Sequence, residues 1–207
     1  MVSPDARRRG IGAALLDAAL TLCRERSDRR PLLIVPRPSV AGKRLALRRG
    51  GVFDHSEHAL VLSGDPTTGS RDPAITLRPA TVADLPVVSR LLELGFGEPA
   101  PAGLPERLDS PRERTAIVEL AGSAVGTLRL RRDGSDAGIY GFVIDPAWRG
   151  RGIGRAALRR ACDQLRAEDA HRIGLEVDVE NDRALTLYTS VGFTPTGTED
   201  YFALPLG

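Results

Sequence analysis

A short segment rich in glycine and arginine is the first part of this chain that could carry chemistry. Residues 149–154 read R-x-x-G-x-G and lie between a predicted strand and a predicted helix. Glycines let backbone N–H groups approach an anion closely, because no Cβ stands in the way. A helix N-terminus adds unpaired N–H groups and the positive end of its dipole. The segment therefore predicts a pyrophosphate site, with Arg149, Arg151 and Arg155 adding positive charge at its edge.

Two other phosphate-binding motifs fit this segment less well. A P-loop ends in G-K-[ST], whereas Gly154 is followed by Arg155. A dinucleotide-binding fingerprint requires a strand that runs straight into its first glycine, whereas residues 145–149 intervene here. A plain glycine turn without a ligand remains open on this segment alone.

The predicted strand 173–179 carries acidic side chains on one face. In an extended strand Ile173, Leu175 and Val177 point one way, and Glu176 and Asp178 point the other way. A carboxylate close to a reacting amine can act as a general base. The same alternation also fits a strand whose polar face meets solvent.

A second motif follows this strand. Residues 181–193 read N-D-R-A-L-T-L-Y-T-S-V-G-F. Together with residues 149–154, this motif resembles the GNAT N-acetyltransferase superfamily, over 75–207 in full and over 1–62 in part. The resemblance implies an α/β fold, in which a central mixed β-sheet is splayed between strands four and five and is flanked by helices.

The resemblance also implies acetyl-CoA as the acyl donor. Backbone groups of the fourth strand would pair with the pantetheine arm, and the loop after it would hold the pyrophosphate. Asn181 would contact the pantetheine or the CoA phosphates, although its place before a predicted helix also fits an N-cap. The implied strand and loop residues are Phe142, Val143, Ile144, Gly150, Arg151, Gly152, Ile153, Gly154 and Arg155.

The resemblance further suggests catalytic roles. The sequence L-E-V at 175–177, followed by Asn181, looks like the corresponding strand of the ribosomal-protein alanine acetyltransferase branch. That likeness implies Glu176 as the base and Tyr188 as the acid, although Tyr188 also fits an aromatic core position. The expected function is acetyl transfer to a primary amine of a small molecule or a peptide N-terminus. The alternative is an acetyl-CoA-binding sensor or scaffold domain without turnover.

The chain also repeats part of itself. Residues 3–12 match residues 145–154 at an offset of 142, and each match opens the order helix, strand, helix, glycine, strand. We therefore expect residues 1–62 to be the C-terminal half of a degenerate GNAT domain. Residues 63–74 would be a linker and residues 75–207 a complete GNAT domain. The offset also leads us to expect that the frame upstream of Met1 encodes a segment resembling 75–144; a stop codon close to Met1 would instead indicate a relic half-domain.

The first copy departs from the motif. With Gly51 aligned to Gly192, Leu47 falls at the position of Tyr188. The strand that would pair with pantetheine is nearly absent from the first copy. We therefore expect one acetyl-CoA site per chain, in the second copy.

Composition argues against several other classes of protein. A net charge of +2, from 29 basic and 27 acidic residues, does not favour a nucleic-acid partner. No apolar run is long enough to span a membrane, and the three histidines lack metal-ligand spacing. Cys23 and Cys162 are read as buried thiols in a reducing cytoplasm. The oligomeric state stays open, and a homodimer is compatible with the sequence.

Overall fold

The computed structural model describes residues 2–6, 8–25, 31–66, 72, 74–101, 103–110 and 113–206. The chain divides into two compact units. Unit 1 comprises Met1–His58 and Gly197–Gly207, and unit 2 comprises Ala59–Thr196. The predicted linker 63–74 lies partly outside the described residues, and its residues 63–66 form no helix or strand.

Eight strands form one mixed sheet, as expected for the α/β class. The sheet order is β1-β8-β2-β7-β6-β5-β4-β3. The strands are β1 (Leu32–Pro36), β2 (Val52–Leu62), β3 (Ile75–Pro79), β4 (Glu113–Leu120), β5 (Ser123–Asp133), β6 (Asp136–Ile144), β7 (Arg172–Asp178) and β8 (Thr194–Ala203).

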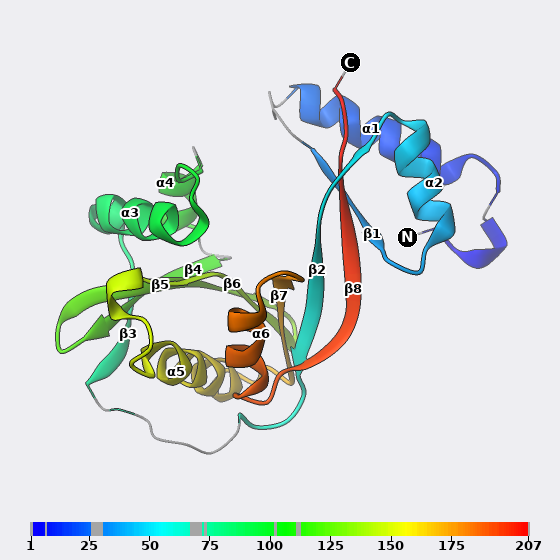
Figure 1. Ribbon diagram of the computed structural model, residues 1–207. Helices are drawn as coiled ribbons and strands as arrows, with labels where there is room; N and C mark the ends of the chain where they lie inside the picture. Colours follow the sequence, from blue (N-terminus) through cyan, green and yellow to red (C-terminus); the bar gives the residue numbers. More distant parts are fainter. Residues whose placement is uncertain are drawn as a thin grey trace. The chain divides into compact units, whose positions relative to one another are not determined.

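Helices cover both faces of the sheet in unit 2. Figure 1 shows α5 (Ile153–Ala167) against one face, and α3 (Leu85–Phe96) and α4 (Leu104–Leu108) against the other. A hydrophobic core lies on each face of this part of the sheet. Adjacent residues of β4 point into different cores, because side chains alternate along a strand. Val118 packs in the core that includes Leu158 of α5, whereas Ile117 packs with Val88 and Leu104.

The strands of unit 2 form a meander and then a crossover. Strands β3, β4, β5 and β6 pair antiparallel in chain order. The chain then passes through the short 3₁₀ helix η3 (Pro146–Trp148) and through α5 before it returns as β7, parallel to β6. A parallel neighbour requires such a helical crossover. Helix α6 (Asp182–Thr189) follows β7.

A capping box formed by Thr81 and Asp84 precedes α3 and belongs to the 3₁₀ turn that leads into this helix. The Asp84 carboxylate accepts a hydrogen bond from the backbone N–H of Thr81 at 2.8 Å. Arg78 of β3 donates to both oxygens of Asp84, at 3.0 and 2.8 Å. These bonds join the strand to the 3₁₀ turn η2 (Val82–Asp84) that leads into α3.

Unit 1 holds the short 3₁₀ helix η1 (Pro4–Ala6), α1 (Ile11–Glu25), β1, α2 (Val40–Arg48) and most of β2 and β8. Its core is small and includes Val35, Ala46 and Phe202. The order helix, strand, helix, strand in 11–62 is the same as in 153–203. That residues 1–62 are half of a degenerate domain stays a prediction.

Two expectations about single elements need correction. Cys162 is buried as predicted, and burial raises the pKa of its thiol to about 12, but Cys23 is only half-buried. The final strands of the two copies, expected at 58–62 and 199–204, are longer than that, since β2 begins at Val52 and β8 at Thr194. No helix among the described residues has the length and apolar character needed to cross a membrane.

Candidate functional site

Strands β6 and β7 separate after three paired positions. Asp136, Ala137 and Gly138 pair with Arg172, Ile173 and Gly174, and the pairing ends there. Because β6 continues to Ile144 and β7 to Asp178, the facing edges of the two strands beyond these pairs do not bond to each other. Unpaired strand edges can bind an extended partner. The predicted splay between the fourth and fifth strands is confirmed.

A β-bulge lies in β6 beside this opening. Thr127 pairs with Val143 and Arg129 with Tyr140, so Leu128 alone stands opposite Gly141 and Phe142. Gly141 has φ +56°, a left-handed conformation that favours glycine. A bulge bends its strand and re-aims the side chains around it. The separation of β6 from β7 therefore has a local cause in the sequence.

The bulge is followed by the three predicted strand residues, which point to both faces of the sheet. Phe142 and Ile144 are half-buried and pack against the core beneath α5. Val143 is buried on the other side, where a Cβ on Gly95 of α3 would stand 2.4 Å from a Val143 methyl. Their contact with a pantetheine arm stays a prediction.

The loop between β6 and α5 leaves room for an anion. Gly150 and Gly152 have φ values of +78° and +79°. A Cβ at either position would meet nothing within 4 Å, so the backbone there borders open space. Helix α5 begins directly at Ile153, and its first turn carries no acidic residue. Free N–H groups of a first helical turn are donors suited to a phosphate.

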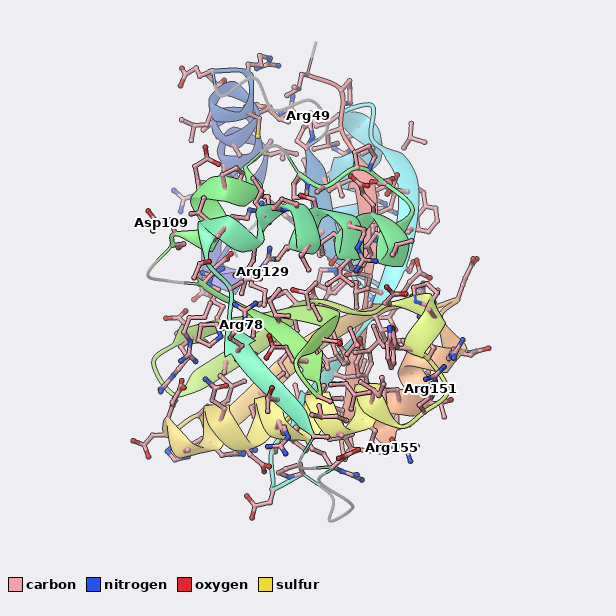
Figure 2. All side chains as sticks on the ribbon, turned by 90° about the vertical axis from the view of Figure 1, so that its left-hand side faces the viewer. Arg49, Arg78, Asp109, Arg129, Arg151 and Arg155 are labelled. Carbon is pink, nitrogen blue, oxygen red and sulfur yellow. The ribbon has the colours of Figure 1, made fainter. Side chains whose placement is uncertain are left out.

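Arginine side chains surround this loop, and contacts to neighbouring residues hold them there. Arg149 Nε donates to the Ile144 carbonyl at 2.9 Å, and Arg155 Nε donates to Ser190 Oγ at 2.9 Å. The Arg151 guanidinium lies 5.0 Å from the centre of the Trp148 ring. Figure 2 shows Arg151 and Arg155 at the same end of α5. The loop and its arginines thus fit a pyrophosphate in shape and in charge.

Asn181 is the N-cap of α6, which agrees with one of the two interpretations of this residue from the sequence. Its Oδ1 accepts a hydrogen bond from the Ala184 backbone N–H at 3.0 Å. The side chain is exposed, so the cap does not prevent a second contact with a ligand. The predicted contact with CoA stays a prediction.

Tyr188 lies in the core on the α5 side of the sheet. It is buried, and its ring meets Phe193 edge to face at 6.3 Å. Burial raises the pKa of its hydroxyl to about 12, because the charged form would lose hydration. The hydroxyl is therefore protonated at neutral pH and can donate a proton. The side chain also packs in the core, so both interpretations of Tyr188 agree with this position.

Glu176 is exposed on the opposite face of β7. Its neighbours Leu175 and Val177 are buried in the α5 core, so the predicted alternation is confirmed. The Asp178 side chain bonds within its own turn, because its Oδ1 accepts a hydrogen bond from the Glu180 backbone N–H at 2.7 Å. The predicted base therefore faces away from the core that holds the predicted acid, Tyr188.

Glu176 lines a hollow of about 380 Å³ whose lining belongs entirely to unit 2. We call this hollow the glycine pocket, because Gly138 and Gly174 lie side by side in its floor. Tyr140 and several charged side chains also line it. Sequence reasoning missed Tyr140 and the two glycines, because only the register of β6 against β7 brings them together.

Comparison with known proteins agrees with this geometry. Residues 1–50 and 87–193 match the model of the acetyltransferase (GNAT) family. The chain therefore belongs to the GNAT acetyltransferase family, whose members use acetyl-CoA as the acyl donor.

Individual relatives share parts of the chain. A mycothiol acetyltransferase of Beutenbergia cavernae is 42% identical over 73 residues, which are 35% of this chain and 25% of the relative. The N-alpha-acetyltransferase RimI of Mycobacterium tuberculosis is 37% identical over 101 residues, 47% of this chain and 62% of the relative. The chain thus spans less than two thirds of either relative.

A solved GNAT structure has the same fold. The GCN5-related N-acetyltransferase of Sphaerobacter thermophilus superposes with a TM-score of 0.69 at 20% identity, over 99% of this chain and 71% of that protein.

Proposed function

We propose that this chain transfers the acetyl group of acetyl-CoA to a primary amine of a small molecule or a peptide N-terminus. The observation that carries the proposal is the opening between β6 and β7, next to the glycine loop at the start of α5. Acetyl-CoA, when bound, supplies a thioester that an amine can attack. The residues of the chain would bind, orient and move protons around it.

Binding would use the three groups of residues described above. The β6 edge from Phe142 to Ile144 would bond to the pantetheine arm. The loop from Gly150 to Arg155 would donate N–H and guanidinium hydrogen bonds to the pyrophosphate. Asn181 would contact the donor beyond the end of β7.

Proton transfer would use Glu176 and Tyr188. The Glu176 carboxylate accepts the proton that the amine must lose as its nitrogen forms the new bond to the acetyl carbon. The Tyr188 hydroxyl donates a proton to the sulfur as the carbon–sulfur bond breaks. The Tyr188 hydroxyl is protonated at neutral pH, so it holds a proton to donate.

The relatives support both kinds of amine acceptor. One relative is named an N-alpha-acetyltransferase, and another, from Stenotrophomonas maltophilia, is an aminoglycoside N(6')-acetyltransferase. A cytoplasmic location and a homodimer belong to the same proposal.

The test is release of free CoA thiol from acetyl-CoA in the presence of a panel of amines. We expect thiol release that depends on the amine and a matching gain of the acetyl mass on that amine. Binding of acetyl-CoA without thiol release for any amine would favour the sensor or scaffold domain instead.

A further inference from the structure

We propose that Tyr140 binds the acceptor amine opposite Glu176, and that the glycine pocket holds a primary amine on a polar carrier. This inference rests on the proposed acetyl transfer, because it names the acceptor side of that same site. It assigns acceptor binding to Tyr140 and to the glycines in the floor of the pocket, and neither sequence motif contains these residues.

The first observation is the register of the strands. The pairs of β6 with β7 keep a constant offset up to Gly138 and Gly174. Two residues further along each strand stand Tyr140 and Glu176, which lie on the same face as the two glycines. Both side chains therefore stand at the point where the strands separate, and both line the pocket. An amine entering from this face meets both side chains.

The second observation is how Tyr140 is held. A Cβ on Gly138 would come within 2.5–2.7 Å of the Tyr140 ring and hydroxyl, so the ring lies directly over that glycine. The Arg129 guanidinium lies 5.5 Å from the ring centre and pairs with Glu113 at 3.3 Å. Within the described residues, no hydrogen bond engages the Tyr140 hydroxyl. The ring is thus fixed while its hydroxyl can still bond to a ligand.

The third observation is the floor beside the ring. A Cβ on Gly174 would have only ordinary contacts, 3.8 Å from the Ala137 carbonyl oxygen and 3.9 Å from that of Leu60. Glycine inside a strand often marks a place where a ligand approaches the backbone closely. The space above Gly174 is therefore open for the carrier of the amine.

The walls of the pocket set the class of acceptor. Arg131, Asp133, Asp136 and Arg172 line the side away from the opening, and Arg172 lies 3.8 Å from Asp136. Mixed charges of this kind bind hydroxyl, amide and ionic groups better than an aromatic hydrocarbon, whose burial would strip them of water. We therefore expect a polar carrier such as a peptide N-terminus or an amino sugar.

Tyr140 positions the acceptor amine and takes no part in proton transfer. Its hydroxyl oxygen accepts one N–H hydrogen bond from the acceptor, and no proton passes to it. Glu176 takes the proton that the amine releases. With two of its hydrogens engaged, the nitrogen is oriented toward the opening between β6 and β7.

The experiment compares Tyr140→Phe and Gly174→Ala with wild type. The probes are an alanine-initiated tetrapeptide, kanamycin and 2-phenylethylamine. Loss of one hydrogen bond, or a methyl group in the floor, should raise KM for the better polar probe about tenfold in each variant. The KM for acetyl-CoA should stay within about twofold. Gly197→Ala, whose Cβ would meet nothing within 4 Å and which lies outside the pocket, is the matched control.

Gly138→Ala provides a second route, because it keeps the Tyr140 hydroxyl but displaces the ring. It should also raise the acceptor KM. Unchanged acceptor KM in all three pocket variants, with turnover intact, would overturn the inference and leave the proposed function standing. A lower KM for 2-phenylethylamine than for both polar probes would overturn the polar class. No turnover of any probe, despite acetyl-CoA binding, would overturn both proposals.

Discussion

The Tyr188 hydroxyl, which is neutral at its ordinary pKa of 10, is held further in that state by burial. Its pKa is raised to about 12, so the proton remains on the hydroxyl through the whole neutral range. The ring also packs against Phe193, and this packing does not depend on the hydroxyl.

Replacement of Tyr188 by Phe separates these two roles. The ring and its packing remain, so the affinity for acetyl-CoA, measured by calorimetry, should hold. Turnover should fall by about 10²–10⁴ if the proton transfer is lost. Turnover at the wild-type rate would leave Tyr188 as a packing residue only.

Glu176 and Asp178 share one face of β7, yet their surroundings differ. Asp178 accepts a backbone N–H, whereas Glu176 lines the glycine pocket. Glu176→Gln should lower kcat and remove the acidic limb of the pH–rate profile, because an amide cannot accept the amine proton. Asp178→Asn, the matched control, should retain that limb. If the limb persists in Glu176→Gln and disappears in Asp178→Asn, Asp178 is the base.

These residues differ in how far sequence could predict them. Alternation along 173–179 predicted the exposed face of Glu176, and the position of Asn181 predicted an N-cap, because both depend only on near neighbours in the chain. Tyr140 could not be found in this way. Its importance comes from the register of β6 against β7, which joins residues about 36 positions apart through a helical crossover.

The glycine loop and the start of α5 have a counterpart in the segment that leads into α1, 142 residues earlier in the chain. Gly154 lies beside Ile144 and Leu187, with ordinary contacts of 3.5 and 3.4 Å for an added Cβ. Gly12, at the matching position 142 residues earlier, lies in the first turn of α1, and a Cβ added there would stand 3.8 Å from Val2 and 3.9 Å from Leu45. The two positions therefore allow a paired experiment.

Gly154→Glu should abolish acetyl-CoA binding, because it puts a carboxylate where the pyrophosphate is expected. Gly12→Glu should change binding little, since we expect one site per chain. Calorimetry gives both the affinity and the stoichiometry. Equal losses in the two variants, or two equivalent sites in the wild type, would contradict this assignment.

The start of α3 depends on an ion pair whose strength varies with pH. Hydrogen bonds from Arg78, and then from the backbone of Thr81, hold the pKa of Asp84 well below its ordinary 3.8. A carboxyl with a lowered folded-state pKa stabilises the fold above pH 3.8, and that contribution is lost as the pH falls further.

Asp84→Asn should therefore lower the free energy of unfolding by about 1–2 kcal/mol at neutral pH, since it removes a charged cap. The gap between variant and wild type should shrink as the pH falls below 3.8. Thermal denaturation at pH 7 and at pH 3 measures both values. A gap that is the same at the two pH values would show that charge does not contribute.

The resemblance to the GNAT superfamily implied the mixed sheet and the splay. Hydrophobic periodicity and the positions of glycines, which are local signals, predicted the order of elements. The sequence did not predict that β2 and β8 each contribute to both compact units. Strand order across a sheet depends on long-range pairing, and alternation does not encode it.

Unit 1 exposes apolar side chains at positions whose counterparts are buried in unit 2. Leu15 is 58% exposed, whereas Ala157, 142 residues later, is 0% exposed. Val52 is 68% exposed, whereas Phe193, which follows the matching glycine, is 1% exposed. Ile11, Leu22, Leu32, Ile34, Val40, Leu47 and Phe53 are exposed as well. In unit 2, residues of β3 to β6 pack against α5 in one hydrophobic core. Among the described residues, unit 1 has no counterparts of these four strands to pack against α1 and β1.

An apolar surface of this extent favours association, because burial removes it from water. We expect the 207-residue chain to form dimers or larger species whose fraction rises with concentration in sedimentation velocity.

The double variant Leu15→Glu and Leu47→Glu should shift the chain toward monomer, since each glutamate would have to lose its hydration at the contact. Thr21→Glu with Ala41→Glu adds the same charge at exposed positions of α1 and α2 without removing a large apolar side chain, so it should leave association unchanged. Acetyl-CoA binding should persist in both variants, because none of these residues lies in 142–155. A wild-type chain that stays monomeric at every concentration would contradict this prediction, and so would equal dissociation by the two double variants, which would make net charge the cause.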